Sequence, residues 1–182
     1  MIARRVLAAL LLALGGAASA QVLAPQYPGG FKPEFKEDQP WEEQKWSLPA
    51  YPAEENLVGF DAGPASSFRF FVDKTSVSVG KDGVIRYTLV ARSSSGATNV
   101  SYEGLRCASQ ERRLYAFGRA DKTWAEARNT DWARISFSPH HLALADEYFC
   151  PPRGEVRTAE EAVAALKRGG HPAGRYLLNE PR

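Results

Sequence analysis

Three histidines are the side chains of this sequence best suited to bind a metal ion or to transfer a proton, and they are His140, His141 and His171. On a helix, adjacent residues point about 100° apart, so His140 and His141 do not form the i, i+4 pair with which helices bind zinc. We expect these histidines to be solvated or to cap the start of a helix. The alternative is a metal site assembled from His140 and His141 with Asp146 or Glu147.

Other catalytic motifs are missing from the sequence. There is no G-x-S-x-G turn to present a nucleophilic serine, and there is no glycine-rich loop to bind a phosphate. Asp146 and Glu147 are sequence neighbours, and we expect both to be solvated. The sequence therefore indicates no catalytic residue, no cofactor and no metal site, and an enzyme stays an open alternative.

The first twenty residues predict a secretory signal peptide. Arg4 and Arg5 give it a positive start, residues 6–16 form its apolar run, and small residues at 18–20 provide a signal-peptidase site before Gln21. The apolar run is shorter than the roughly twenty residues that span a membrane. We therefore expect a soluble periplasmic chain that has no membrane span after cleavage.

The two cysteines, Cys107 and Cys150, lie 43 residues apart. A redox pair would have C-x-x-C spacing, and a structural zinc site would need further ligands nearby. In an exported chain, two lone cysteines are most simply one disulfide bond. On the chain-entropy account, closing a loop of this size stabilises the fold by roughly 4 kcal/mol.

Charge is balanced overall and uneven along the chain. Without the signal peptide there are 21 basic and 21 acidic residues, so net charge gives no reason to expect nucleic acid as a partner. Residues 66–119 carry nine basic and four acidic residues, whereas residues 21–65 carry three basic and eight acidic ones.

The excess of arginine in residues 66–119 has two interpretations. One is ordinary cross-strand pairing with Glu103 and Glu111. The other is an anion-binding surface on a sheet face that also carries Tyr102. The candidate anion-binding residues are Arg86, Arg92, Arg106, Arg112 and Arg113.

Composition divides the chain into four parts. They are a signal peptide (1–20), a proline-rich acidic arm (21–65), an α+β domain (66–170) and a C-terminal tail (171–182). The arm holds seven of the twelve prolines, which interrupt any helix or strand period. Trp41 and Trp46 are costly to leave in water, so we expect part of the arm to dock on the domain. A flexible spacer whose tryptophans contact another protein is the competing interpretation.

The pattern from residue 66 onward predicts an antiparallel meander followed by helices. Alternating apolar residues predict strands at 68–73, 76–79, 84–92, 99–107, 112–119 and 122–128. Short connections between successive strands favour antiparallel pairing. The fold class is therefore α+β, an antiparallel β-meander with C-terminal helices packed on one face.

Two helices are expected near the C-terminus. The first begins at Pro139 after Ser138 as N-cap, and we expect Leu142, Ala145 and Phe149 on its apolar face. The second lies within residues 158–170. Its signals are a capping box at Thr158 and Glu161 and a terminating Gly169.

The chain contains, in this order, the blocks "SVGKDGVIRYTLVARSSSGATNVSYEGLRC", "RLYAFGR", "DEYFC" and "GGHP". From Trp41 to Pro172, these blocks make it resemble the cryptic neisserial protein-like family of exported proteobacterial proteins. The resemblance implies a signal peptide and an envelope location. It implies no particular activity and brings no catalytic residue to this chain.

We therefore expect an exported envelope protein that acts as a non-enzymatic binding or structural module. Its partner would be another envelope protein or an anionic envelope component. The alternative is a small hydrolase or metal-dependent enzyme with a site assembled around His140 and His141. A concave pocket that gathers histidines and carboxylates would favour the enzyme, and a broad basic face would favour the binding module.

Overall fold

The computed structural model describes residues 40–63, 66–151 and 154–174. The predicted signal peptide, the part of the arm before residue 40 and the tail after residue 174 lie outside these residues.

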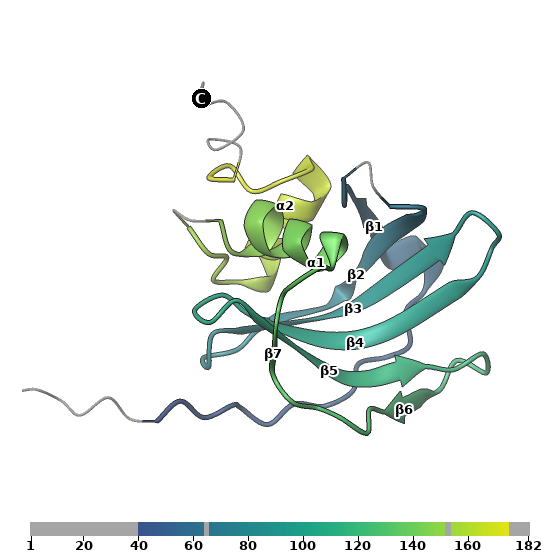
Figure 1. The fold of residues 1–182 in the computed structure, drawn as a ribbon, viewed down its shortest axis with the longest axis horizontal. Helices are drawn as coiled ribbons and strands as arrows, with labels where there is room; N and C mark the ends of the chain where they lie inside the picture. The colour runs from purple at the N-terminus through teal and green to yellow at the C-terminus, as the bar shows by residue number, and fades with distance from the viewer. Residues whose placement is uncertain (1–39, 64–65, 152–153, 175–182) are drawn as a thin grey trace, which may run out of the picture. The chain divides into compact units, whose positions relative to one another are not determined.

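Seven strands in the described residues form one antiparallel sheet, in the order β1-β2-β3-β4-β5-β6 with β7 also paired to β5 (Figure 1). The strands are β1 (Leu57–Phe60), β2 (Phe68–Val79), β3 (Val84–Ser93), β4 (Thr98–Arg106), β5 (Glu111–Gly118), β6 (Trp124–Glu126) and β7 (Ala133–Arg134). Sequential neighbours pair throughout β1 to β6, so the predicted meander is confirmed.

Strand β2 joins the two short strands that the sequence predicts at 68–73 and 76–79. Its register with β3 shifts between Asp73 and Ser78. Asp73 Oδ1 accepts hydrogen bonds from the backbone and hydroxyl of Thr75, at 2.9 and 2.7 Å. This local bonding competes with the ladder, which explains why the sequence pattern breaks where the strand continues.

The helical segments follow the strands. They are a short 3₁₀ turn η1 (Glu54–Asn56), helix α1 (Pro139–Ala143), a π-helical stretch η2 (Leu144–Phe149) and helix α2 (Ala159–Arg168). The predicted N-cap Thr158 and the terminating Gly169 of α2 are confirmed, because the Glu161 N–H donates to Thr158 Oγ1 at 3.2 Å and Gly169 is left-handed with φ of 73°. The second half of the predicted capping box differs, because the Glu161 side chain accepts from the Arg157 N–H at 2.7 Å.

The predicted apolar face of the first helix is wrong in one residue. Leu142 is 38% exposed, whereas Leu144 and Tyr148 are buried together with the expected Ala145 and Phe149. The Cys150 N–H bonds to the carbonyl of Ala145, five residues earlier. The wider π turn rotates the later side chains relative to an α-helical count, and Leu142 falls outside the core.

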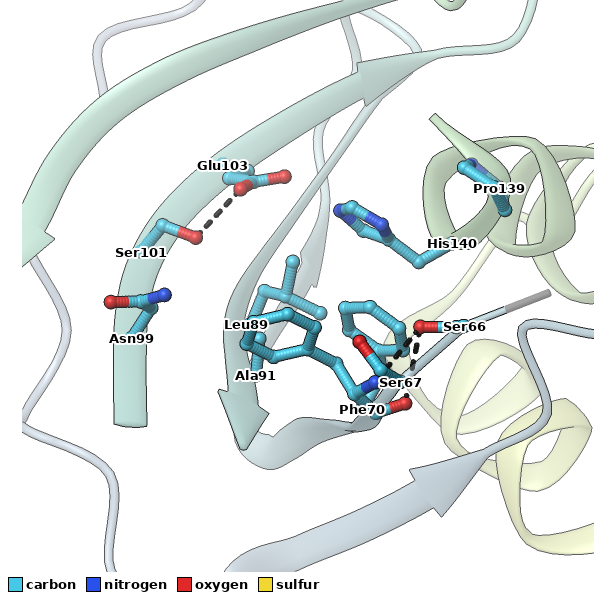
Figure 2. A pocket seen from close by; sticks show the side chains of 11 residues that line it. Ser66, Ser67, Phe70, Leu89, Ala91, Asn99, Ser101, Glu103, Pro139 and His140 are labelled. Atoms are coloured by element: carbon cyan, nitrogen blue, oxygen red, sulfur yellow. Dashed lines mark hydrogen bonds between the residues drawn. The ribbon is translucent and has the colours of Figure 1, made fainter. Parts of the chain in front are cut away.

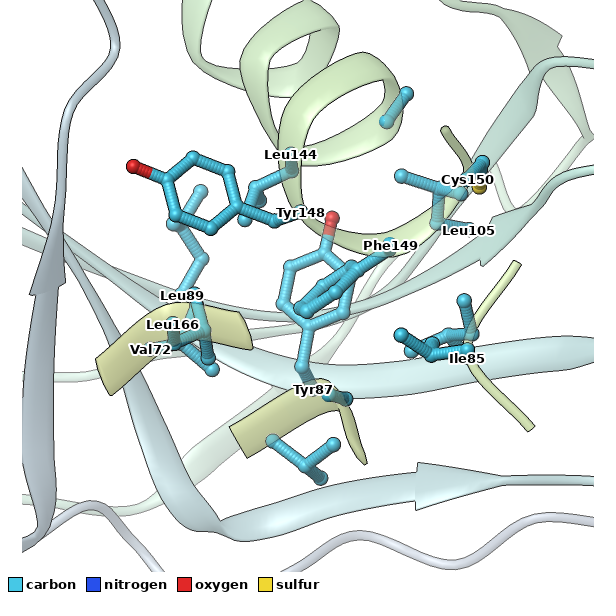
Figure 3. Close-up of a cluster of buried hydrophobic side chains, with 14 of the residues drawn as sticks. Val72, Ile85, Tyr87, Leu89, Leu105, Leu144, Tyr148, Phe149, Cys150 and Leu166 are labelled. Atoms are coloured by element: carbon cyan, nitrogen blue, oxygen red, sulfur yellow. The ribbon is translucent and has the colours of Figure 1, made fainter. Parts of the chain in front are cut away.

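The main core lies between one face of the sheet and the helices, which cover it as predicted (Figures 1 and 3). Alternate residues of β3 point into it, namely Ile85, Tyr87 and Leu89. The helical segments contribute Leu144, Phe149 and Leu166. Burying side chains of this size contributes about 1.5–3 kcal/mol each, so this face fixes the position of the helices on the sheet.

The opposite face of the sheet is covered by residues 40–53, which run along it without regular structure (Figure 1). The ring of Trp46 packs against Tyr115 with centroids 4.4 Å apart, and Tyr102 is its second aromatic neighbour. Trp124 Nε1 donates to the carbonyl of Pro49 at 2.9 Å. The same segment then leads into β1, a strand that lies inside the range assigned to the arm and that the sequence did not predict.

The disulfide between Cys107 and Cys150 is confirmed. It joins the residue after β4 to the residue after η2, so it links a central strand of the sheet to the helical layer. The bond therefore closes the loop that contains β5, β6, β7 and the first helix.

We predict that replacing both cysteines by serine lowers the free energy of unfolding by about 2–4 kcal/mol, because the unfolded chain regains the entropy that the cross-link removes. Urea denaturation of oxidised protein measures this loss. Reductant should destabilise the natural chain by a similar amount and leave the double variant unchanged. A natural chain that is indifferent to reductant would contradict the prediction.

Candidate functional site

A cavity of about 450 Å³ opens on the helix-covered side of the sheet, between α1 and strands β2 to β4 (Figure 2). Its lining consists of Ser66, Ser67, Phe68, Phe70, Leu89, Ala91, Asn99, Ser101, Glu103, Pro139 and His140. The volume falls in the range of small-molecule sites. Three strands and a helix supply nine of these eleven side chains, and Ser66 and Ser67 lie just before β2.

The cavity has one polar wall and one apolar wall. Asn99, Ser101 and Glu103 are alternate residues of β4, so they point to the same side of the strand. The register places Ala91 beside Asn99 and Leu89 beside Ser101. Phe70 pairs with Ala91 from the other side, so the apolar wall continues across β3 into β2.

Glu103 is the ionised group of the polar wall, and it is 4% exposed. Its Oε1 accepts from Ser101 Oγ at 2.6 Å, and its Oε2 lies 2.6 Å from His141 Nε2 and 3.3 Å from Tyr87 Oη. Burial alone would raise the pKa of Glu103. The hydrogen bonds from His141 and Ser101 and the charge of Arg112 outweigh burial and hold this pKa at about 2.

His141 is buried, so the expectation of a solvated histidine is wrong for this residue. An ionised carboxylate only accepts hydrogen bonds, so His141 Nε2 carries a proton and donates to Glu103. Nδ1 on the other side of the ring lies 2.7 Å from Ser138 Oγ. Ser138 does precede the helix as predicted, yet its hydroxyl contacts His141 and makes no N-cap hydrogen bond.

His140 lines the cavity and stacks on Phe70, with ring centroids 4.3 Å apart and an interplanar angle of 14°. Burial and the charges of His141 and Arg112 lower the pKa of His140 from 6.5 to about 4, against the opposing effect of Glu103. The imidazole is therefore neutral at neutral pH and serves the cavity as an aromatic surface.

Other candidate metal ligands stay apart from this site. His171 Nδ1 accepts from the backbone N–H of Ala173 at 3.1 Å. Asp146 is exposed, and burial raises the pKa of Glu147. In the described part of the chain, no three histidine, cysteine, aspartate or glutamate side chains cluster in a way that could hold a metal ion.

We predict that His140 makes the protein less stable in weak acid. Its pKa is lower in the folded state, so its contribution to stability is full above about pH 6.5 and is lost as the pH falls toward about 4. His140→Gln should therefore show a smaller fall in unfolding free energy between pH 7 and pH 4.5 than the natural chain. Urea denaturation across this range measures both, and equal slopes would contradict the prediction.

A second cavity, of about 640 Å³, lies on the far side of Phe68 and Phe70. Phe60, Phe71 and Tyr148 line it. Its charged residues, Asp61 and Arg69, are exposed to solvent. It therefore has no buried charged group comparable to Glu103 among the residues that the structure describes.

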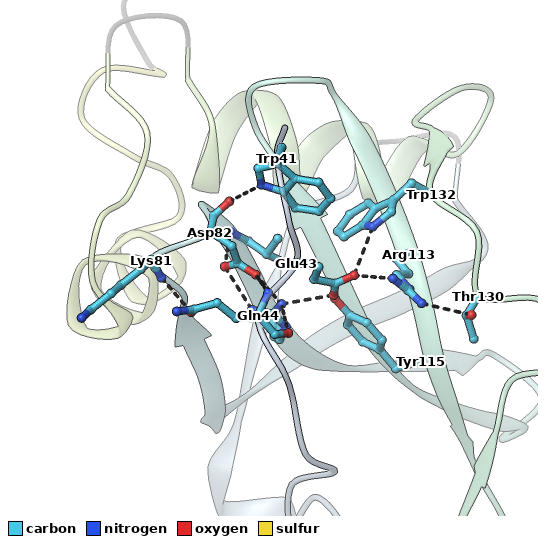
Figure 4. A network of polar contacts seen from close by, with 11 residues as sticks. Trp41, Glu43, Gln44, Lys81, Asp82, Arg113, Tyr115, Thr130 and Trp132 are labelled. Atoms are coloured by element: carbon cyan, nitrogen blue, oxygen red, sulfur yellow. Dashed lines mark hydrogen bonds and ion pairs between the residues drawn. The ribbon is translucent and has the colours of Figure 1, made fainter. Parts of the chain in front are cut away.

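On the opposite face of the sheet, donors from distant parts of the chain meet on the carboxylate of Glu43 (Figure 4). Oε2 pairs with Arg113 and accepts from Trp132 Nε1 at 3.2 Å. Oε1 accepts from Tyr115 Oη at 2.5 Å and from Arg86 Nη2 at 3.1 Å. We call this set the Glu43 cluster.

Glycine at position 104 makes room for the Glu43 cluster. A Cβ at Gly104 would lie 2.4 Å from Tyr115 Oη, closer than real side chains approach. Gly104 is on β4 beside Arg86 of β3 and Arg113 of β5. The missing side chain therefore lets the Tyr115 ring cross the strand to reach Glu43.

The five candidate anion-binding arginines are divided between the two faces of the sheet. Arg86 also pairs with Asp82 at 2.6 Å, and Arg92 pairs with Glu54 at 2.5 Å. Arg106 lies over the ring of Trp41, 3.9 Å from its centroid. These three and Arg113 lie on the face of the sheet that residues 40–53 cover, which we call the arm face, and all of them but Arg106 pair with carboxylates of the described residues. Anion binding by these residues stays a prediction.

Arg112 is the exception among the five. It pairs in register with Leu105, a residue of the main core, so it lies on the helix-covered side of the sheet. Its charge there acts on Glu103 and Tyr87. Arg112 therefore belongs to the surroundings of the cavity.

We predict that Glu43→Gln lowers the free energy of unfolding by about 2–3 kcal/mol, because it leaves Arg86 and Arg113 without their shared carboxylate. Urea denaturation measures the change. The matched control is Glu42→Gln, an exposed neighbour whose replacement should cost less than about 0.5 kcal/mol. Equal effects of the two substitutions would show that the Glu43 cluster does not hold the arm.

Comparison with known protein families shows to which family the chain belongs. The model of the CNP1-like family matches residues 36–167, which is more than half of the sequence. The chain belongs to the CNP1-like family. The match includes the cavity, the Glu43 cluster and both cysteines. No curated protein and no solved structure matches this CNP1-like protein.

One further property of this CNP1-like protein concerns membranes. Among the residues described, no helix is long and apolar enough to cross a bilayer.

Sequence reasoning missed the residues that form the polar wall of this CNP1-like protein. The sequence predicted Glu103 only as a cross-strand partner of arginines. In the structure its side chain lies on the other face from Arg86 and bonds to His141. Asn99 and Ser101 had no assigned role. Their alternation with Glu103 was a usable signal, since three polar residues on one side of a central strand need an explanation.

Proposed function

We propose that this CNP1-like protein is exported to the cell envelope and binds a small molecule in the cavity between α1 and strands β2 to β4. The observation that carries the proposal is the pairing of a hydrogen-bonding wall on β4 with an apolar wall on β2 and β3. Small-molecule sites are mostly apolar with a few fixed polar groups. The predicted signal peptide supports export.

The states of the titratable groups favour binding over acid–base catalysis. A catalytic acid or base works best with a pKa near the operating pH. Glu103 is shifted down to about 2 and His140 down to about 4. Near neutral pH, one is therefore fixed as an anion and the other as a neutral ring, which suits recognition of a ligand.

Hydrolysis is the second candidate function, and one observation favours it. Ser138, His141 and Glu103 form a hydrogen-bonded line, with distances of 2.7 and 2.6 Å, and these are the residue types of a hydrolytic triad. The cavity also gathers a histidine and a carboxylate. Ser138, however, is not among the residues that line the cavity, so a molecule bound there would not meet its hydroxyl. Ester turnover by the purified protein would favour this second candidate.

We predict that fragments bind in the cavity and depend on Asn99. The full precursor is expressed, and the mass of the periplasmic protein checks cleavage after Ala20. Ligand-observed NMR of a fragment library then identifies binders. Asn99→Leu should abolish binding of a subset of fragments, because it replaces a cavity-lining amide by an apolar side chain.

The matched control is Thr98→Leu, since Thr98 is also exposed and points to the opposite side of β4. Binding in the cavity is contradicted if no fragment distinguishes the two variants. A precursor that remains uncleaved in the cytoplasm would contradict export.

A further inference from the structure

The polar wall of the cavity offers mainly hydrogen-bond acceptors. Glu103 is ionised and only accepts. The Ser101 hydroxyl donates its proton to Glu103 at 2.6 Å, so its oxygen faces the cavity as an acceptor. Asn99 is exposed and provides one acceptor and two donors. A ligand that pairs with this wall must present hydrogen-bond donors, such as hydroxyl groups.

The charge of Glu103 and its neighbours decides whether the ligand's hydrogen-bond donors are charged or neutral. An anionic ligand would face the carboxylate of Glu103 and be repelled. The charge of Glu103 is already offset by Arg112 and by its hydrogen bond to His141. Desolvating an ammonium group costs several kcal/mol, which only an uncompensated charge repays. A hydroxyl group costs much less to desolvate, so the wall favours neutral donors.

The opposite wall offers flat apolar surface. Phe68 is 37% exposed at the rim, and the stacked rings of Phe70 and His140 lie beside it. His140 presents a neutral aromatic ring because its pKa is about 4. Aromatic faces of this kind pack against the apolar face of a ring compound.

The length of the polar wall limits the size of the ligand. Residues four apart on a strand are separated by about 13 Å, so Asn99 and Glu103 span a distance comparable to the length of a disaccharide. The cavity volume of about 450 Å³ is also large enough for a molecule of this size.

We propose that the ligand is a neutral, hydroxyl-bearing ring compound of about the size of a disaccharide, with its hydroxyl edge on β4 and a C–H face on Phe68 and His140. This inference rests on the proposed function, since it names the class of ligand for the same cavity. Both walls contribute, so a loss on either side should weaken binding.

The experiment titrates the mature protein with disaccharides of three charges and follows backbone amides by ¹⁵N–¹H NMR. Cellobiose, maltose and N,N′-diacetylchitobiose are the neutral probes, deacetylated chitobiose is the cationic probe, and digalacturonate is the anionic probe. At least one neutral probe should shift the amides of Asn99, Ser101 and His140 saturably, with at least tenfold higher affinity than either charged probe.

Two pairs of variants separate the walls. Asn99→Leu should weaken neutral binding at least tenfold, and Thr98→Leu should leave it unchanged. Phe68→Ala should also weaken it, whereas Phe137→Ala, a change at a fully exposed ring outside the cavity lining, should not. Because the two targets and their controls are exposed side chains, all four variants should fold.

The outcomes distinguish this inference from the proposed function. A charged probe that binds the cavity more tightly than every neutral one would overturn the ligand class and leave cavity binding intact. The same holds if no disaccharide binds but fragments sensitive to Asn99→Leu are found. If neither disaccharides nor fragments perturb the cavity residues, both proposals fail.

Discussion

The structure depends on covering both faces of a single antiparallel sheet. A sheet exposed to water on an apolar face is unstable, and this one has large side chains on both sides. The helices cover Ile85, Tyr87 and Leu89 on one side. On the other side, a segment without helix or strand covers Tyr102 and Tyr115 through Trp46. The Glu43 cluster fixes this segment where no backbone ladder could.

The two covered faces differ in the role of their polar groups. On the arm face, Glu43 receives hydrogen bonds from four side chains. On the helix face, the helical layer leaves the outer part of β4 uncovered, and Asn99 and Ser101 face the cavity. The polar groups of the arm face thus hold the segment 40–53 on the sheet, whereas on the proposed function those of the other face would contact the ligand.

Much of the fold could be predicted because the relevant signals are local. Strand β3 alternates cleanly, and the ends of α2 carry Thr158 and Gly169, whose effects act within one turn. Leu142 was misplaced because the π turn in η2 depends on packing. Strand β1 was missed because a four-residue strand among prolines is stabilised by pairing with β2.

The candidate site could not be predicted in the same way. Glu103 and His141 are 38 residues apart, and no pattern in either segment indicates that they meet. Their contact follows from the β4–α1 packing, which sequence periodicity does not specify. The disulfide was predictable without any geometry, because only two cysteines exist and export allows them one simple pairing.

The disulfide also has a consequence for when the cavity exists. Cys107 follows β4, the strand that forms the polar wall. Cys150 follows the helical segment α1–η2, whose first residues, Pro139 and His140, also line the cavity. The disulfide therefore cross-links the strand of the polar wall directly to this helical segment, and this link forms only after oxidation. On the proposal that the chain is exported, the precursor in the reducing cytoplasm lacks this link. The cavity would then gain the stabilisation of the cross-link only after export.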